Sequence, residues 1–239
     1  MNAWRQGAVV VLIPAWNEER TIYRVVRDIR LGQGFPVVVV DDASSDATRE
    51  EAVRAGAIMI PMPFRSGAFS AIQAGIRYAS ARGARICVTF DADGQHEPES
   101  IPLLCREMEA AKANVVMGCC PARGSRLRRI AWALFRRLTG FTYRDLTSGL
   151  KAYDREAMRV LLSDQAINLD YQDVGSLLLF RDKGLCIREI NVRMLDRMDG
   201  HSRIFHSWFD VSLYMVRSLL LCLASLIPGR RASKEAGRP

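Results

Sequence analysis

Two aspartates separated by one residue come directly after an apolar run in the stretch VTFDADGQHEP (88–98). Asp91 and Asp93 carry carboxylates, which are ligands that hard divalent cations such as Mg²⁺ and Mn²⁺ prefer. Asp and Gly are also common in ordinary turns, so the pair alone does not separate a metal site from a strand exit. The residues after the other predicted strands decide between the two.

Polar clusters come after two further apolar runs in the same way. The run at 8–13 leads into PAWNEE (14–19), and the run at 36–41 leads into DASSD (42–46). Ligands of open α/β sheets bind at the carboxyl ends of the strands. Three polar, acid-bearing strand ends on one edge of the sheet therefore favour a binding site over chance turns.

Short runs rich in Val and Ile alternate with helical patterns through the first 120 residues. This alternation predicts right-handed βαβ units and a mostly parallel, doubly wound α/β sheet. The predicted strands are 8–13, 36–41, 57–61, 85–90 and 114–118, and the predicted helices are 18–31, 45–55, 67–82 and 98–112. After residue 120 the predicted elements are a basic amphipathic helix at 125–138, a strand at 149–153, helices at 155–162 and 170–183, a strand at 185–190, and an apolar helix within 205–227.

Composition favours a globular protein with an anionic partner. Of 239 residues, 49% are hydrophobic and 25% are charged, and the net charge is +8. Such an excess suits a nucleotide, a lipid phosphate, a membrane surface or a nucleic acid. The first residues lead straight into a strand pattern without a signal peptide, and the six cysteines show no CxxC spacing. We therefore expect reduced thiols in a cytoplasmic protein.

If the protein binds a nucleotide, the negative charge of its phosphates must be neutralised without the usual glycine-rich phosphate-binding motifs. No GxGxxG comes after the first predicted strand, and no GxxxxGK[ST] occurs, so dinucleotide and P-loop sites are poorly supported. Mg²⁺ or Mn²⁺ held by Asp91 and Asp93 would bridge a diphosphate and stabilise charge on a leaving group. Asp42 would accept hydrogen bonds from a base or ribose. A reaction in which a nucleoside diphosphate leaves a sugar fits these residues.

Four motifs carry a resemblance to a known family: IPAWNEE, VVVDDASSDAT, DADGQHEPE and DLTSGLKAY, in this order. The chain resembles family 2 glycosyltransferases of the GT-A (Rossmann-like) fold, and among them the polyprenyl-phosphate glycosyltransferases of the dolichyl-phosphate mannose synthase type. The resemblance covers about residues 8–204. It implies an inverting, metal-dependent enzyme that moves a hexose from a UDP- or GDP-sugar to an undecaprenyl or dolichyl phosphate.

The resemblance also implies roles for individual residues. Contacts with the nucleotide sugar are expected from Pro14, Trp16, Glu18, Val40, Asp42, Asp91, Ala92, Arg197 and Arg203. Metal ligands are expected at Asp91, Asp93 and Gln95, and the acceptor phosphate is assigned to Arg128 or Arg129. Arg197 and Arg203 belong to the segment RMDGHSR (197–203), which is expected to close over the donor phosphates and exclude water.

Two segments depart from the family pattern. The run GCC (118–120) lacks an arginine that the family often has, unless Arg123 replaces it, and RSGAF (65–69) lacks a lysine and a glycine. Both segments would touch donor or acceptor, so the identities of the sugar and the acceptor stay open. A catalytically silent, membrane-docked binding module that keeps the fold is the remaining alternative outside the enzyme class.

The acceptor determines which catalytic groups are needed. A hydroxyl acceptor requires a general base, for which Asp173 is the candidate beside Asp93 and Arg197 as catalytic residues. A phosphate acceptor is already anionic, so positioning and charge stabilisation suffice. Asp173 is equally interpretable as an acid in the first turn of a helix. His96 is either a group beside the metal ligands or a plain turn histidine.

Two segments suggest contact with a membrane. The basic amphipathic helix at 125–138 mixes arginines with apolar residues, as interfacial helices do. The run 211–228 is interrupted by Arg217 and has an uninterrupted apolar core of about ten residues, short of the ~20 needed to span a bilayer. This run either packs against the domain or lies as a helix in the membrane interface. We expect a domain at 1–204 and an apolar, basic appendage at 205–239 that lies on the cytoplasmic face. Nucleic-acid binding would leave the acidic site unexplained, and the sequence does not define an oligomeric state.

Overall fold

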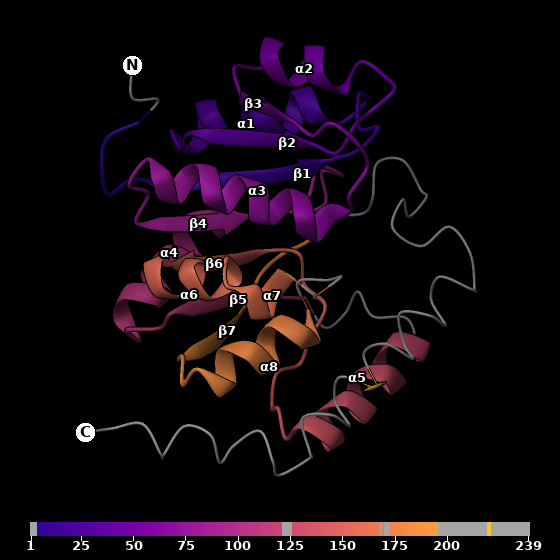
Figure 1. Cartoon of the computed structure of the whole chain (residues 1–239), viewed down its shortest axis with the longest axis vertical. Coiled ribbons are helices and arrows are strands. Elements are labelled where there is room, and N and C mark those ends of the chain that lie inside the picture. The colour runs from indigo at the N-terminus through magenta and orange to yellow at the C-terminus, as the bar shows by residue number, and fades with distance from the viewer. Residues whose placement is uncertain (1–3, 121–125, 168, 170–172, 196–218, 221–239) are drawn as a thin grey trace.

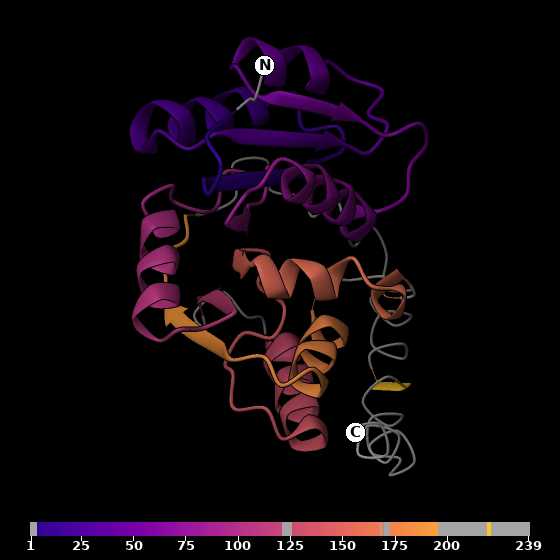
Figure 2. The same ribbon diagram turned by 60° about the vertical axis from the view of Figure 1, so that its left-hand side comes forward.

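The computed structural model describes residues 4–120, 126–167, 169, 173–195 and 219–220 (Figure 1). A seven-stranded sheet runs through the molecule in the order β3-β2-β1-β4-β6-β5-β7, with helices on both sides (Figures 1 and 2). The strands are β1 Val9–Ala15, β2 Val37–Asp41, β3 Ile58–Pro61, β4 Ile86–Thr89, β5 Val115–Cys119, β6 Lys151–Asp154 and β7 Ile187–Asn191. The helices are α1 Ile22–Gln33, α2 Thr48–Arg54, α3 Ala68–Ala81, α4 Ser100–Ala110, α5 Arg126–Thr139, α6 Arg155–Leu161, α7 Asp164–Ile167 and α8 Val174–Asp182.

The predicted mostly parallel sheet is confirmed, with β6 as the antiparallel member. Strand β1 pairs in parallel with β2 on one side and β4 on the other, whereas β6 runs antiparallel to both β4 and β5. The chain therefore adds β2 and β3 on one side of β1 and then crosses to the other side of β1 to add β4. Such a topological switch is where open α/β sheets place their ligand crevice.

Two apolar layers hold the helices against the sheet. Alternate strand residues face opposite sides because side chains in a strand have a period of two. Val11 and Ile13 belong to the layer that also holds buried residues of α1, α2 and α4, and Val10 and Leu12 belong to the layer that holds those of α3, α6 and α8. Both faces are covered, which explains why β1 and β2 read as continuous apolar runs rather than alternating ones.

Two predicted helices begin later in the structure than in the sequence prediction. The helix expected from residue 18 starts at Ile22, and the one expected from residue 45 starts at Thr48. The polar residues ahead of them hydrogen-bond to each other across the strand ends: the Glu18 N–H donates to Thr48 Oγ1 at 2.7 Å. These tertiary hydrogen bonds hold both segments as loops.

The second half of the chain has the predicted order of elements with one addition. The basic helix, the strand at 151–154 and the helices α6 and α8 are present, and the short helix α7 was not predicted. Helix α5 packs against α8, where Arg181 Nη1 donates to the carbonyl of Thr139 at 2.7 Å. No helix among the described residues is long and apolar enough to cross a membrane. The predicted domain boundary at 204–205 lies outside the described residues.

Candidate active site at the carboxyl edge of the sheet

The loops after β1 and β2 are joined by reciprocal hydrogen bonds. The Asn17 N–H donates to Ser44 Oγ, and the Ser45 N–H donates to Asn17 Oδ1, both at 2.9 Å. Asn17 and Ala43 adopt positive φ angles of 55° and 58°. This region is uncommon for residues other than glycine, and alanine has no side-chain hydrogen bond to offset its strain. The two strand ends therefore form one braced edge.

Asp42 fastens a third segment to this edge. Its carboxylate is buried and accepts the backbone N–H groups of Ser66 at 2.6 Å and Gly67 at 2.8 Å. The preceding Arg65 places its guanidinium 3.5 Å from the ring centroid of Trp16. The segment 65–67, which the sequence marked only as a departure from the family pattern, thus covers two predicted nucleotide contacts.

The other predicted nucleotide contacts differ in burial: two are partly exposed at the edge and two are buried in the core. Pro14 and Glu18 are half-buried at the end of β1. Val40 is fully buried, and its side chain faces Gly75 of α3 in the core. Ala92 is also buried, in the layer beneath α1 and α4. Val40 and Ala92 therefore support the edge from within the core.

Asp91 leaves β4 with its carboxylate held by a histidine. His96 Nε2 lies 3.0 Å from Asp91 Oδ2, and the His96 side chain is 1% exposed, against 31% for Asp91. The imidazole packs edge-on to Phe90, with ring centroids 5.4 Å apart. Its Nδ1 has no hydrogen-bond partner within the described part of the chain. Donation from Nε2–H to Asp91 is the arrangement that this geometry supports, so His96 lies directly behind a predicted metal ligand.

The turn after Asp91 is joined to the segment after β7. Asp93 Oδ1 accepts the Gln95 N–H at 3.1 Å. The Leu195 N–H donates to the Gln95 carbonyl at 2.8 Å, and Gln95 Nε2 lies 3.4 Å from the Leu195 carbonyl. A bridge between His96 and Met194 continues this pairing. The chain is therefore held beside the three predicted metal ligands shortly before it enters 197–203.

The three predicted metal ligands form a set of hard oxygen donors. Asp91, Asp93 and Gln95 lie together on the turn after β4, and the Gln95 amide directs its nitrogen to Leu195, which leaves Oε1 as its ligand atom. Among the described residues, no three His, Cys, Asp or Glu side chains form a metal-holding group by themselves. Proteins usually bind Mg²⁺ through one or two carboxylates, and phosphate oxygens of the substrate and water molecules complete its coordination. The residues fit a cation that arrives with a diphosphate.

Lys151 is a buried cation that the sequence analysis did not single out. It opens β6 opposite Thr89, and it is 0% exposed. Burial lowers the pKa of its ammonium to about 8, against the opposing effect of the negative charges on Asp173, Asp145 and Asp91. In the sequence, the burial of this lysine is indicated only by its position inside the largely apolar run GLKAY (149–153).

The predicted acceptor and lid arginines fall largely outside the described part of the chain. Arg123, Arg197 and Arg203 lie outside it, while Arg128 and Arg129 are placed by the backbone of α5. Asp173 stands at the N-cap of α8, but its side chain makes no capping hydrogen bond. Its negative charge opposes the effect of burial on the pKa of Lys151.

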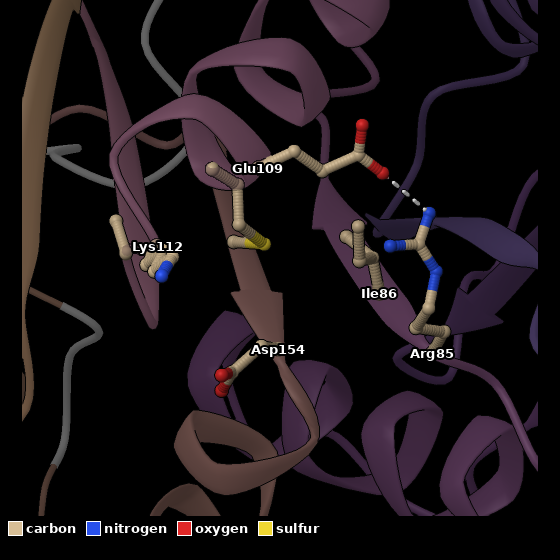
Figure 3. Close-up of a pocket in the computed structure, with 7 residues that line it drawn as sticks. Arg85, Ile86, Glu109, Lys112 and Asp154 are labelled. Atoms are coloured by element: carbon tan, nitrogen blue, oxygen red, sulfur yellow. Dashed lines mark hydrogen bonds and ion pairs between the residues drawn. The ribbon is translucent and has the colours of Figure 1, made fainter.

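A hollow at the opposite edge of the sheet offers no comparable chemistry. Arg85, Glu109, Lys112 and Asp154 surround it near the amino end of β4 (Figure 3). Arg85 and Glu109 form an ion pair at 2.9 Å across its rim. None of the predicted site residues lines this hollow. The carboxyl edge is therefore the candidate active site.

Solved structures share the α/β architecture of this chain, which is the GT-A fold. The fold is shared with glucosyl-3-phosphoglycerate synthase from Mycobacterium tuberculosis, solved in complex with Mn²⁺, UDP and phosphoglyceric acid. The TM-score is 0.68, with 22% sequence identity over 92% of this chain and 78% of that one. Residues 10–167 match the family model of glycosyl transferase family 2. The chain belongs to this family and is a glycosyltransferase.

Two curated relatives cover most of this chain. Undecaprenyl-phosphate mannosyltransferase from Micrococcus luteus is 29% identical over 216 residues, which is 82% of this chain and 87% of the relative. Polyprenol monophosphomannose synthase from Mycolicibacterium smegmatis is 29% identical over 245 residues, which is 88% of each chain. The resemblance to polyprenyl-phosphate glycosyltransferases is thereby confirmed.

Proposed function

We propose that this protein transfers a hexose from a nucleoside diphosphate sugar to a polyprenyl phosphate at the cytoplasmic face of a membrane. The observation that carries the proposal is the turn bearing Asp91, Asp93 and Gln95 at the carboxyl end of β4, beside the braced ends of β1 and β2, in a family 2 glycosyltransferase. The names of both relatives include a polyprenyl or undecaprenyl phosphate product or substrate.

The donor would lie across the ends of β1, β2 and β4. In this proposal Trp16 and Arg65 contact the base, and Asp42 contacts the base or ribose while it anchors the segment 65–67. Pro14 and Glu18 complete the wall of the pocket, and the buried Val40 supports it from the core. The diphosphate lies at Asp91 and Asp93, with Arg197 and Arg203 closing over it.

Mg²⁺ or Mn²⁺ would be held by Asp91, Asp93 and Gln95 together with the donor diphosphate. A bound divalent cation supplies stabilisation of the negative charge that builds on the departing nucleoside diphosphate. The similar fold solved with Mn²⁺ and UDP supports this assignment. Asp91 and Asp93 also orient the donor, so that its anomeric carbon faces the acceptor side of the sheet edge.

The acceptor phosphate would approach from the side of α5. Arg128, Arg129 and Arg123 are the proposed phosphate contacts. Ile130 is 65% exposed and Leu134 is 42% exposed, one turn apart on α5, while Trp132 and Phe135 are buried beneath them. An exposed apolar pair on a basic helix is suited to an interface between lipid headgroups and acyl chains.

A phosphate acceptor makes the transfer a single displacement. An anionic phosphate oxygen attacks the anomeric carbon and forms a new C–O bond, while the bond from that carbon to the diphosphate breaks from the opposite face. The electron pair leaves with the nucleoside diphosphate, and the anomeric configuration inverts. No proton has to be removed from the acceptor, so positioning and charge stabilisation carry the reaction.

A transfer assay with purified protein tests this proposal. Mn²⁺ or Mg²⁺ and a panel of UDP- and GDP-sugars are supplied with and without undecaprenyl or dolichyl phosphate, and both the nucleoside diphosphate and the glycolipid are measured. We expect nucleoside diphosphate release that depends on the lipid phosphate, with an equal amount of glycolipid by mass spectrometry.

Two outcomes would contradict the proposal. Release that depends on a saccharide or another hydroxyl acceptor, and not on lipid phosphate, would move the assignment to a hydroxyl-directed transferase. Donor binding without transfer to any acceptor tested would favour a silent binding module.

A further inference from the structure

The carboxylate of Asp42 is bound to the backbone of a later segment. Asp42 is 4% exposed, and its Oδ1 and Oδ2 accept the N–H groups of Ser66 and Gly67 at 2.6 Å and 2.8 Å. Hydrogen bonds to a charged acceptor are stronger than neutral ones, and two consecutive N–H groups on one carboxylate fix the orientation of the peptide. The Asp42 N–H donates to the Ala15 carbonyl at 2.8 Å. Asp42 therefore ties this segment to the end of β1, directly before Trp16.

The segment 62–67 is held at both of its ends. At its start the Met62 N–H donates to the carbonyl of Asp41 at 2.8 Å. At its end Gly67 has a φ of 90° and a ψ of 157°, a conformation that is essentially confined to glycine, and it is the N-cap residue of α3. Arg65 lies between these two fixed points, so its backbone has a defined place at the carboxyl edge.

The side chain of Arg65 lies on the ring of Trp16. Its guanidinium is 3.5 Å from the ring centroid, which is within the range of a cation–π contact, and the residue is exposed. Trp16 is an expected contact of the nucleotide. A base that stacks on Trp16 therefore meets Arg65, either beside the guanidinium on the ring or in its place.

We infer that Arg65 determines which base the donor site accepts, and that Asp42 is a positioning residue that acts on donor binding through Arg65. An aromatic ring stacks on every base with little selectivity. A guanidinium has only N–H donors and no acceptor, so it discriminates between bases whose edges place their acceptors differently. This inference rests on the proposed nucleotide-sugar donor and not on the proposed lipid acceptor.

The neighbouring aspartate is also bound to groups of the protein. Asp41 is 0% exposed, and its Oδ2 accepts Arg49 Nε at 2.5 Å and the Ser44 N–H at 3.2 Å. Both aspartates after β2 thus organise the loops of the edge. If Asp42 read the base by itself, its effect on nucleotide affinity would be independent of Arg65. If it acts through Arg65, its effect disappears when Arg65 is removed.

A double-mutant cycle on nucleotide affinity separates these two cases. Calorimetry of UDP and GDP in Mn²⁺ compares the wild type, Asp42→Asn, Arg65→Ala and the double variant. We expect Arg65→Ala to weaken binding of the preferred nucleotide by about tenfold and to bring the affinities for UDP and GDP closer together, because the remaining ring is tolerant of either base. Asp42→Asn should also weaken binding, but by less than about twofold when Arg65 is already alanine.

Two controls show that the effect belongs to this contact and to the nucleoside. Arg82 lies 3.6 Å from the ring centroid of Tyr78, a matched pair at the opposite end of α3, so Arg82→Ala should leave nucleotide binding unchanged. Inorganic pyrophosphate in Mn²⁺ carries the diphosphate without a base. Arg65→Ala should bind it as the wild type does, and an equal loss of pyrophosphate binding would move Arg65 from the base to the phosphates.

Nuclear magnetic resonance tests the positioning role in the absence of any ligand. The ring current of Trp16 shifts the Arg65 side-chain protons upfield, and Trp16→Leu should abolish this shift. We expect Asp42→Asn to reduce it. Gly67→Ala should reduce it as well, because alanine is strained at this φ although nothing lies within 4 Å of its Cβ. Where Asp42→Asn does not fold, Gly67→Ala replaces it in the affinity cycle with the same expectations.

Several results would overturn the inference. Multiplication of the Asp42→Asn and Arg65→Ala effects would show that Asp42 acts on the nucleotide directly. Tighter binding by Arg65→Ala would make Arg65 a competitor for the ring. Equal affinity of the wild type for UDP and GDP, or an unchanged ratio in Arg65→Ala, would exclude a role in specificity. Absence of nucleotide binding in the wild type would overturn the proposed function as well, whereas transfer to a hydroxyl acceptor would overturn the proposed function alone.

Discussion

Asp91 is the residue on which the contacts of the site converge. Its carboxylate meets His96 Nε2 at 3.0 Å and lies close to the backbone at Gly149. Asp93, two residues later, bonds instead to the backbone of its own turn. The two aspartates of the motif are therefore held differently: Asp91 contacts a side chain and a backbone segment outside its own strand, and Asp93 accepts a hydrogen bond within its own turn.

At the scale of the residue, Asp93→Ala tests the metal assignment. Removing one of two carboxylate ligands should weaken Mn²⁺-dependent nucleotide binding by more than about a hundredfold. The domain should remain folded, because Asp93 lies in a turn and its hydrogen bond with the Gln95 N–H stays within that turn. Binding is measured by calorimetry with and without Mn²⁺, and circular dichroism reports the fold.

Asp182→Ala is the matched control for Asp93→Ala. Asp182 is exposed on α8, and its ion pair with Arg181 at 3.6 Å lies on the surface. Such pairs contribute little to stability, so nucleotide binding should be unchanged. Equal affinity of Asp93→Ala and the wild type in Mn²⁺ would refute the role of Asp93 as a metal ligand.

At the scale of the element, the close approach of β6 to β4 shapes the site. A Cβ built on Gly149, just before β6, would lie 2.5 Å from Asp91 Oδ2 and 2.8 Å from Asp91 Cγ. Real Cβ contacts are not this short, so only glycine lets the Asp91 carboxylate occupy its place. The antiparallel strand thus delivers both a cation, Lys151, and a space at one carboxylate.

Gly149→Ala should therefore displace the Asp91 carboxylate. We expect metal-dependent nucleotide binding to fall by about tenfold to a hundredfold, as it does when groups that orient metal ligands are lost. Gly32→Ala is the control, since nothing lies within 4 Å of a Cβ there and Gly32 is exposed on α1. It should stabilise the fold by about 1 kcal/mol through helix propensity.

Calorimetry and urea unfolding of the two glycine variants complete the comparison. Wild-type nucleotide binding by Gly149→Ala would show that the Asp91 carboxylate has another position that serves equally well. Loss of binding in Gly32→Ala would show that the assay responds to changes outside the site.

At the scale of the whole molecule, the chain is basic, and its helix α5 combines arginines with exposed apolar residues. The net charge is +8, and α5 combines its arginines with the exposed pair Ile130 and Leu134. The apolar run at 211–228 and the basic residues after it lie almost wholly outside the described part of the chain. The proposal that the protein lies on an anionic leaflet depends on these basic and apolar segments.

Deleting residues 208–239 tests the contribution of the C-terminal segment. We expect most of the full chain to float with anionic liposomes and most of the truncated chain to remain in the soluble fraction, because the deletion removes the apolar run and its basic tail. Liposomes without anionic lipid and a high-salt sample are the controls. Flotation of the truncated chain at the level of the full chain would exclude this segment as the main anchor.

The local pattern of the sequence determined the fold and the edge that carries the site. The Val- and Ile-rich runs at 8–13 and 36–41 predicted buried strands within a residue or two of β1 and β2, because strands covered on both faces leave a continuous apolar signal. The polar clusters after them marked the carboxyl edge. The aspartates at 91 and 93 were found because their chemistry and spacing are visible within one turn.

Only the tertiary structure decided how the charges of the site are arranged. It shortened the helices after β1 and β2 through the bonds between Asn17 and Ser44, and it placed Arg65 on Trp16. It also buried Lys151 completely, opposite Thr89 of β4. Sequence periodicity reports whether a residue is buried, but the partner of a buried charge comes from another part of the chain, so it is defined only when the strands have paired.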